Sequence, residues 1–142
     1  MGINKVIYST TVVVKGGRDG QAQTEGGALD LTLAVPKEMG GQGNKGTNPE
    51  QLFAAGYAAC FQSALRHTAR RENKNVTESS VIATVGIGPR DEGGFGLKVD
   101  MVVQLSGVTR EEAQQLINTV HAGICPYSNA IRGNVDVDIK VA

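Results

Sequence analysis

The sequence predicts an α+β fold in which antiparallel sheets wrap around one long, buried central helix. Strand-like segments occur in neighbouring groups separated by short glycine-containing turns, which is typical of antiparallel pairing. A helix that begins at Pro49 has no charged side chain over residues 52–61. A helix that is apolar on every side must be buried on every side. Together these observations favour sheets packed around the helix.

Composition limits the class of protein. The length of 142 residues favours a single domain spanning residues 1–142. The formal net charge is zero and the sequence has no basic cluster, which argues against a nucleic-acid partner because phosphate backbones require clustered lysine and arginine. We expect no signal peptide and no membrane-spanning segment, and therefore a cytoplasmic protein without a membrane partner. Two cysteines in such a chain are more typical of a redox pair or reduced thiols than of a structural disulfide.

The first third of the chain is predicted to form an antiparallel meander. β-Branched residues predict a strand over residues 5–15, and two further strands are predicted over residues 21–25 and 29–35. Glycines in residues 16–20 predict a turn between the first two strands. Residues 36–47 are predicted to form a glycine-rich loop that leads into the central helix.

The central helix has a clear start signal. Asn48 is a good N-cap, Pro49 fits the first helical position, and Glu50 complements the helix dipole in the first turn. Three tyrosines, three phenylalanines and no tryptophan are few large side chains with which to cover an apolar helix. We therefore predict a homodimer in which a second subunit supplies part of the cover. A monomer with the helix between sheet and loops is the alternative.

Two long strands and a second helix follow. Apolar residues alternate over residues 81–87 and 97–105, which predicts a pair of strands. Thr109 and Glu112 have the spacing of a capping box and predict a helix that runs to about His121.

The chain is predicted to end with a short helix and a strand. Cys125 and Pro126 open a helical turn that ends near Gly133. Alternating residues over 135–141 predict a half-exposed strand. We expect this strand, like the others, to pair antiparallel.

The two cysteines are the candidate reactive groups. Cys60 lies near the middle of the apolar helix, and an isolated buried cysteine is usually an unreactive core residue because burial raises its pKa. Cys125 changes this interpretation, since it is expected at a helix N-cap, a position that favours a thiolate and leaves the sulfur partly accessible. Two thiols in such settings are typical of an attacking and a resolving cysteine. Their spacing in the sequence does not show that they meet.

The cysteines and histidines suggest three alternative interpretations. His67 lies seven residues from Cys60, about 10 Å along a helix, which is too far for a Cys–His hydrolase, and His121 is expected to pack at a surface or interface. A zinc site would use the two cysteines and two histidines, but their spacings match no zinc motif, so we predict no metal. A non-enzymatic redox sensor built on the same cysteine pair remains an alternative.

Three motifs together carry a family resemblance. They are Arg18-Asp19-Gly20, GTNPEQLFAAGYAACF at residues 46–61, and CPYSNA at residues 125–130. These segments resemble the organic hydroperoxide resistance (Ohr) proteins of the OsmC/Ohr superfamily. The two cysteine motifs are long and specific, and the resemblance extends over essentially the whole chain. Ile131 stands where the family pattern predicts a threonine.

The resemblance implies a thiol peroxidase. The family residue matching Cys60 attacks the peroxide, and the one matching Cys125 resolves the sulfenic acid as an intramolecular disulfide. Arg18 and Glu50 match the residues that activate the thiolate. The resemblance also implies an OsmC/Ohr-like fold, an intertwined homodimer, organic hydroperoxide substrates, no bound cofactor, reduction by a lipoylated protein and a role in the oxidative stress response. The sister OsmC branch shares the fold and chemistry and differs in the preferred peroxide.

Helix geometry constrains how the activating residues reach the thiol. Ten residues separate Glu50 from Cys60, which is about 15 Å along a helix axis. Because one arginine cannot easily bridge that span, we predict that Arg18 and Glu50 of one subunit meet Cys60 of the other. A nearby arginine lowers the pKa of an acidic group by about 1–3 units, so Arg18 would increase the thiolate fraction of Cys60.

The neighbours of Cys60 predict the substrate class. By three- and four-residue spacing, its helix face carries Leu52, Phe53 and Gly56. These residues offer an apolar approach, on which an alkyl or fatty-acyl hydroperoxide gains about 0.8 kcal/mol for each buried CH₂. Hydrogen peroxide gains nothing there, so we expect a preference for organic peroxides.

Overall fold

The computed structural model describes residues 2–142, which form two compact units, one ending at Pro49 and the other spanning Glu50–Ala142. In the first unit, β1 (Val12–Lys15), β2 (Gln21–Thr24) and β3 (Asp30–Thr32) form an antiparallel sheet in the order β1-β2-β3. This confirms the predicted meander. A 3₁₀ turn over Gly17–Asp19 joins β1 to β2 and carries Arg18. Gly20 must be a glycine, because a Cβ there would overlap the carbonyl oxygen of Lys15.

Two of the predicted strands in this unit are too long. The strand expected over residues 5–15 begins only at Val12, which pairs with Thr24, the last residue of β2. Residues 5–11 run past the end of β2 and are exposed, and no strand within residues 2–142 pairs with them. The strand expected over residues 29–35 is confined to Asp30–Thr32, after which Leu33 makes an isolated parallel bridge to Thr47.

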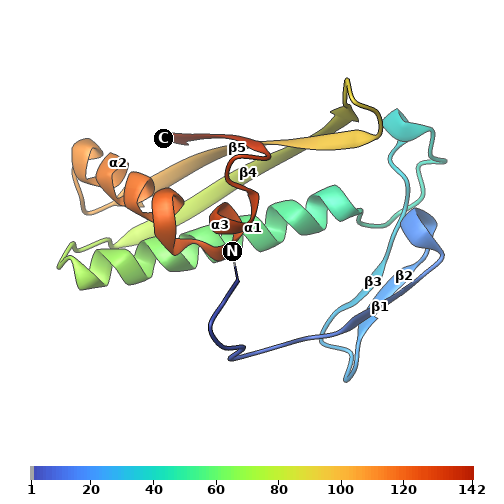
Figure 1. Ribbon diagram of the computed structural model, residues 1–142, viewed down its shortest axis with the longest axis horizontal. Helices are drawn as coiled ribbons and strands as arrows, with labels where there is room; N and C mark the ends of the chain where they lie inside the picture. The colour runs from blue at the N-terminus through green and yellow to red at the C-terminus, as the bar shows by residue number, and fades with distance from the viewer. Residues whose placement is uncertain (1) are drawn as a thin grey trace. The chain divides into compact units, whose positions relative to one another are not determined.

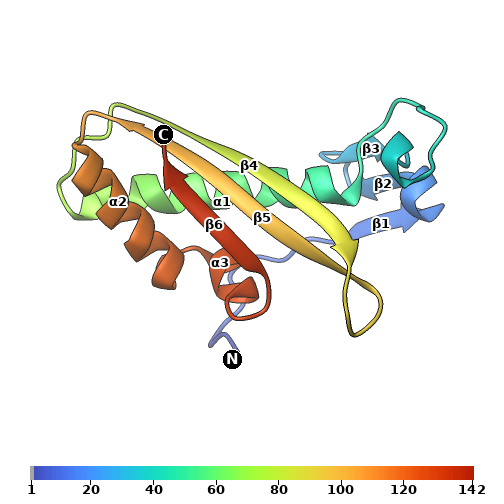
Figure 2. The ribbon, with the colours of Figure 1, turned by 90° about the horizontal axis from the view of Figure 1, so that it is seen from above.

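The second unit is built around α1 (Pro49–Arg71), which begins at the predicted residue. β4 (Glu78–Pro89) and β5 (Phe95–Ser106) form a long antiparallel hairpin, and α1 runs along one face of it (Figures 1 and 2). Buried residues of α1 and β5 meet in the core. They are Tyr57, Phe61 and Leu65 on the helix and Val99, Met101 and Val103 on the strand.

The last strand corrects the prediction of purely antiparallel pairing. β6 (Asp136–Val141) pairs parallel with β5, from Lys98 opposite Asp136 to Val103 opposite Val141. Parallel neighbours require a long crossover. Here α2 (Arg110–Thr119), a π turn over Val120–Ile124 and α3 (Pro126–Ile131) return the chain to the same end of the sheet. The second sheet is therefore mixed, in the order β4-β5-β6.

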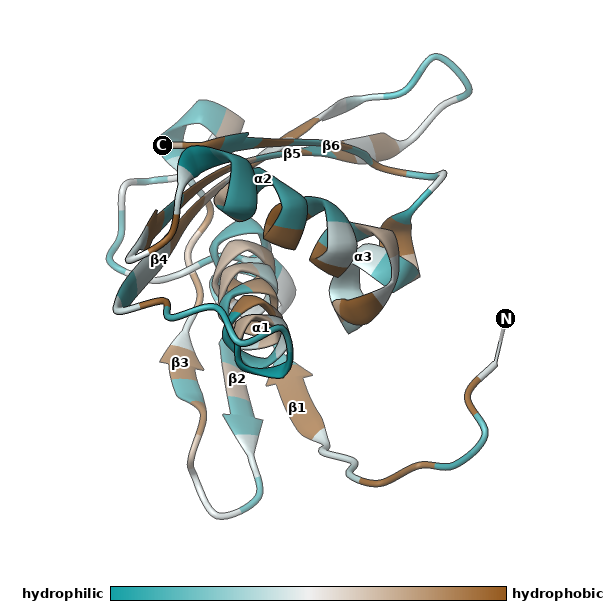
Figure 3. Ribbon diagram, turned by 90° about the vertical axis from the view of Figure 1, so that its left-hand side faces the viewer, coloured by the Kyte–Doolittle hydropathy of each residue, from teal (hydrophilic) through white to brown (hydrophobic). Residues whose placement is uncertain are grey.

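The helices of this unit cover one face of the mixed sheet. Figure 3 shows α1 and α2 on the same side of β5 and β6. The opposite face carries exposed residues such as Ile82 and Lys140. Within this single chain three small residues of α1, Ala55, Ala59 and Ser63, are exposed, so the complete burial predicted for the helix depends on the second subunit, which stays a prediction.

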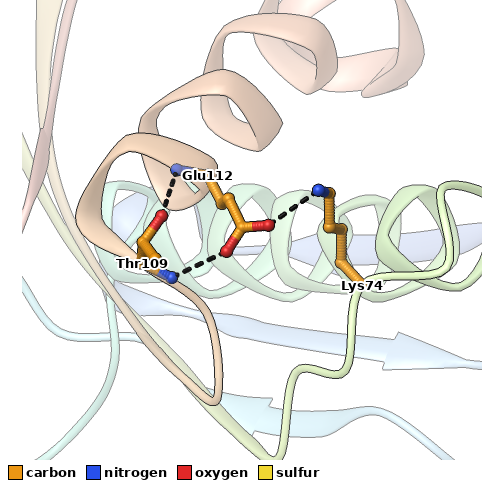
Figure 4. Close-up of polar contacts among 3 residues, drawn as sticks. All are labelled: Lys74, Thr109 and Glu112. Carbon is orange, nitrogen blue, oxygen red and sulfur yellow. Dashed lines mark hydrogen bonds and ion pairs between the residues drawn. The ribbon is translucent and has the colours of Figure 1, made fainter.

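The capping box of α2 is confirmed. The Glu112 amide donates to Thr109 Oγ1 at 3.1 Å, and the Thr109 amide donates to Glu112 Oε1 at 2.9 Å (Figure 4). Lys74, which follows α1, contacts the other carboxylate oxygen at 2.7 Å. This cluster fixes the start of α2 to the segment after α1. The helix itself ends at Thr119, where the π turn replaces the last predicted residues.

Candidate active site

The two cysteines meet in the second unit. Cys60 lies on α1 and is half-buried, and Cys125 immediately precedes α3. The two residues lie 4.1 Å apart. Both are free thiols in this structure. The fold therefore brings together two groups that are separated by most of the second unit in sequence.

The π turn places Cys125. The Cys125 amide donates to the carbonyl oxygen of Val120 at 3.0 Å, which closes a turn one residue wider than an α-helical turn. Pro126 then occupies the first position of α3, and the Asn129 amide donates to the Cys125 carbonyl at 2.9 Å. The predicted N-cap position of Cys125 is confirmed. Turns of the π type are rare and occur frequently at functional sites.

The expected accessibility of Cys125 is wrong. Its exposed fraction is 0%, because the turn that carries it packs into the core with Tyr57 and Val120. Cys60 is the more accessible of the two sulfurs. Because its sulfur is the more accessible, Cys60 is better placed to react with a small molecule that arrives from solvent. The buried Cys125 is placed to react with Cys60.

The surroundings of Cys60 disfavour its thiolate. Burial, followed by the adjacent Cys125, raises the pKa of the Cys60 thiol above its ordinary value. A hydrogen bond from the Tyr127 backbone opposes this shift without cancelling it. This Tyr127 amide was missed in the sequence, since only the fold places it against Cys60.

A buried hydrogen-bond chain beside the cysteines was also missed. Tyr57 Oη and Ser128 Oγ lie 2.6 Å apart, and Ser128 Oγ lies 2.8 Å from His121 Nδ1. Tyr57 and Ser128 are fully buried, and burial raises the pKa of Tyr57. Burial and the nearby Arg132 lower the pKa of His121. The spacing offered a signal, because Tyr57 precedes Cys60 by three residues and Ser128 follows Cys125 by three.

The histidines differ in their settings. His121 is half-buried and borders a cavity of about 520 Å³ between α2 and β6. His67 is exposed on α1. Within residues 2–142 no three His, Cys, Asp or Glu side chains are placed to hold a metal ion. No helix in this part of the chain combines the length and apolarity needed to cross a membrane.

The predicted substrate residues lie on the same helix as Cys60. Phe53 contacts the Tyr57 ring edge-on, with centroids 6.3 Å apart, and Leu52 is half-buried. Gly56 lies under Tyr127, because a Cβ added there would be 3.1 Å from the Tyr127 hydroxyl oxygen. Tyr127 in turn stacks on Tyr57 at 6.0 Å. Phe53, Tyr57 and Tyr127 therefore form an aromatic cluster near Cys60. Contact of the predicted substrate residues with a peroxide stays a prediction.

The predicted activating residues occupy two different units. Arg18 is half-buried in the 3₁₀ turn of the first unit. Glu50 is half-buried in the first turn of α1. Since α1 is continuous, Glu50 and Cys60 are separated by about 15 Å along its axis. Their convergence with Arg18 stays a prediction.

Comparison with known proteins identifies the family. Residues 41–140 match the model for OsmC-like proteins. The organic hydroperoxide resistance protein of Xanthomonas axonopodis is 45% identical over 139 residues, covering 97% of this chain and 96% of that protein. The OhrB protein of Bacillus subtilis is 43% identical over 137 residues, covering 95% of this chain and 98% of OhrB.

Solved structures agree. The crystal structure of B. subtilis OhrB superposes with a TM-score of 0.88 at 41% identity, covering 96% of this chain and 100% of that one. A putative organic hydroperoxide resistance protein from Vibrio cholerae, with captopril bound in one of the active sites, superposes with a TM-score of 0.91 at 48% identity, covering 97% of this chain and 94% of that one. The chain therefore belongs to the OsmC-like family and, within it, to the organic hydroperoxide resistance (Ohr) proteins.

Proposed function

We propose that the protein is a thiol peroxidase that reduces organic hydroperoxides to alcohols, with Cys60 as the attacking residue and Cys125 as the resolving residue. The observation that carries this proposal is the 4.1 Å approach of a half-buried cysteine to a fully buried one. The named relatives support the substrate class, since they are organic hydroperoxide resistance proteins.

The first step oxidises Cys60. Its thiolate attacks one peroxide oxygen, the O–O bond breaks, and an S–O bond forms. The alkoxide that leaves takes up a proton and departs as the alcohol. Cys60 loses two electrons and becomes a sulfenic acid.

The second step protects Cys60. The Cys125 sulfur attacks the Cys60 sulfur, the S–O bond breaks, and an S–S bond forms. The leaving hydroxide combines with the Cys125 thiol proton to give water. Because Cys125 is buried beside Cys60, it reacts with the sulfenic acid before a second peroxide can oxidise that group further. An external dithiol, proposed to be the lipoyl group of a partner protein, returns two electrons and restores both thiols.

Activation of Cys60 requires help from outside its immediate surroundings. Burial and Cys125 raise the pKa of Cys60, so a cation must approach to increase the thiolate fraction. We propose that Arg18, held by Glu50, supplies this charge from the second subunit of a homodimer. The same guanidinium would stabilise charge that develops on the peroxide oxygens.

The preference for organic peroxides follows from apolar neighbours. Leu52, Phe53 and Gly56 are proposed to line the approach to Cys60. A bound alkyl chain gains about 0.8 kcal/mol for each CH₂ buried against such surfaces. Equal rates on organic and inorganic peroxide would contradict this part of the proposal.

A single-turnover thiol count tests the proposal. Reduced protein receives one equivalent of tert-butyl hydroperoxide or of hydrogen peroxide, followed by mass analysis under denaturing conditions. We expect rapid loss of both thiols with a Cys60–Cys125 crosslink, faster with the organic peroxide. Survival of both thiols would overturn the proposal, and Cys60→Ser and Cys125→Ser are the matched controls.

Repeated turnover separates the enzyme from a redox sensor on the same cysteine pair. With excess dithiol and peroxide, we expect the wild-type protein to consume many equivalents. Cys125→Ser is expected to stop during turnover with sulfinic acid on Cys60. A protein that oxidises once and does not turn over would be a sensor instead.

A further inference from the structure

The hydrogen bond between Tyr57 and Ser128 runs beside the cysteine pair. Tyr57 precedes Cys60 by three residues on α1. Ser128 lies in α3, three residues after Cys125, which is the N-cap of that helix. Residues three apart on a helix lie on the same face. The 2.6 Å bond from Tyr57 to Ser128 therefore links the same two elements as the 4.1 Å approach of Cys60 to Cys125.

His121 extends this link to the turn that carries Cys125. Its Nδ1 lies 2.8 Å from Ser128 Oγ, and it precedes Cys125 by four residues within the π turn. With a neutral His121 accepting at Nδ1, Ser128 donates to His121 and accepts from Tyr57. Every hydroxyl proton of the chain is then used, as burial requires.

Surface residues secure the outer end of the chain. Arg132 Nη2 donates to the His121 carbonyl and to Asn129 Oδ1, each at 2.6 Å. Asn129 Nδ2 donates to the carbonyl of Gly123 at 3.1 Å. The π turn is thus held on both sides, at the surface by Arg132 and Asn129 and in the core by Ser128.

We propose that Tyr57, Ser128 and His121 are positioning residues that hold Cys125 within reach of Cys60 and so determine how efficiently the oxidised Cys60 is resolved. This inference rests on the proposed peroxidase function. Disulfide formation needs the two Cβ atoms about 3.5–4.5 Å apart. Loss of one partner leaves a buried polar atom unpaired, and α3 relieves this by moving, which takes Cys125 away from Cys60.

In variants of the positioning residues we expect the fate of the sulfenic acid on Cys60 to change, whereas the rate at which Cys60 is first oxidised stays the same. A sulfenic acid on Cys60 either condenses with Cys125 or meets a second peroxide and becomes sulfinic acid. The positioning residues affect only the condensation of the sulfenic acid with Cys125. Tyr57→Phe and Ser128→Ala are therefore expected to oxidise Cys60 at close to the wild-type rate but to accumulate sulfinic acid.

The test measures this partition by mass analysis after pulses of tert-butyl hydroperoxide at a series of concentrations. We expect about a fivefold to tenfold increase in the ratio of sulfinic acid to disulfide in either variant, which corresponds to the loss of one buried hydrogen bond. The double variant is expected to have no larger effect than Ser128→Ala alone, because loss of the Ser128 hydroxyl already removes its bonds to both Tyr57 and His121. Two variants are used so that poor folding of one does not decide the result.

Val103→Ala and Gln115→Ala serve as controls. Val103 is a fully buried core residue of β5, so its truncation destabilises the protein without touching the hydrogen-bond chain, and Gln115 is exposed on α2. Both are expected to keep the wild-type partition. An unchanged partition in Tyr57→Phe and Ser128→Ala, or an equal change in Val103→Ala, would overturn the inference while leaving the peroxidase intact. A wild-type protein that forms no disulfide would overturn both.

Discussion

At the scale of single residues, the unit that carries Cys60 disfavours the thiolate of this residue. Within its own unit, burial and the adjacent Cys125 raise the pKa of Cys60, and the Tyr127 backbone only partly offsets them. A cysteine in this setting is mostly protonated at neutral pH and reacts slowly. The proposed function therefore requires the charge of Arg18 more strongly than the sequence pattern alone indicated.

Arg18→Ala should raise the pKa of Cys60 further. A higher pKa means a smaller thiolate fraction at pH 7, and each unit lowers the rate of a thiolate reaction about tenfold. The measurement is the pH dependence of iodoacetamide modification of the Cys60 peptide, followed by mass analysis. Arg90→Ala, at an exposed arginine paired with Glu92, is the control. Identical pH profiles for wild type and Arg18→Ala would mean that Arg18 does not activate Cys60.

The residue scale also shows what sequence reasoning can find at a site. Cys60, Cys125 and the N-cap position were recognisable because the motifs are local. The Tyr57–Ser128–His121 chain was missed despite the three-residue spacing of Tyr57 and Ser128 from the cysteines, since its members come from three separate elements and a buried tyrosine is usually only core. The burial of Cys125 was missed for a related reason. Helix-start signals fix a backbone position, whereas accessibility depends on what packs against it.

At the scale of elements, local signals predicted starts and turns better than pairing. The start of α1 at Pro49 and the capping box of α2 were both correct, because each depends on a few neighbouring residues. The parallel pairing of β6 was not predicted, since alternation along a strand looks the same in either direction. Residues 5–11 have the composition of a strand but lie beyond the end of β2, and composition does not report whether a partner exists.

The ion pair at the start of α2 gives a pH-dependent contribution to stability. Lys74 and the Thr109 backbone lower the pKa of Glu112 to about 2. A lowered folded-state pKa stabilises the protein above the unfolded value, about 4.3, and this contribution is lost as the pH falls towards 2. Glu112→Gln keeps a capping acceptor but removes the charge. We expect a lower midpoint of thermal unfolding than wild type at pH 7 and a difference that shrinks between about pH 4.5 and pH 2.

Glu111→Gln is the matched control, because Glu111 lies in the same first turn of α2 and contributes equally to the helix dipole. The excess effect of Glu112→Gln over Glu111→Gln at pH 7 reports the contact with Lys74. If both variants melt at the same temperature across the pH range, the ion pair contributes nothing measurable.

At the scale of the whole molecule, the exposed apolar surface supports the proposed homodimer. α1 exposes Ala55, Ala59 and Ser63, one helical turn apart, in a segment without charges. In the first unit, Ile7 is 89% exposed and Tyr8 is 79% exposed. A single chain leaves these groups in water, whereas a second chain would cover them. We propose that both units fold as one domain within such a dimer.

A charged substitution on α1 tests the assembly. We expect the wild-type protein to have twice the mass of the 14.9 kDa chain by light scattering, and a single unfolding transition whose midpoint rises with protein concentration. Ala59→Glu places a carboxylate in the proposed interface and should yield monomers, while Gln115→Glu at an exposed position of α2 should not. A monomeric wild type, or two separate transitions, would contradict the proposal.

The π turn before Cys125 has a consequence for how the chain tolerates changes in length. A turn that closes from Cys125 to Val120 contains one residue more than an α-helical turn, so deleting one residue from Val120–Ile124 would rotate the following thiol by about 100°. Substitutions at the exposed positions of this segment, Ala122, Gly123 and Ile124, leave that angle intact. Natural relatives are therefore expected to vary the residue types at these positions while conserving the number of residues in the segment.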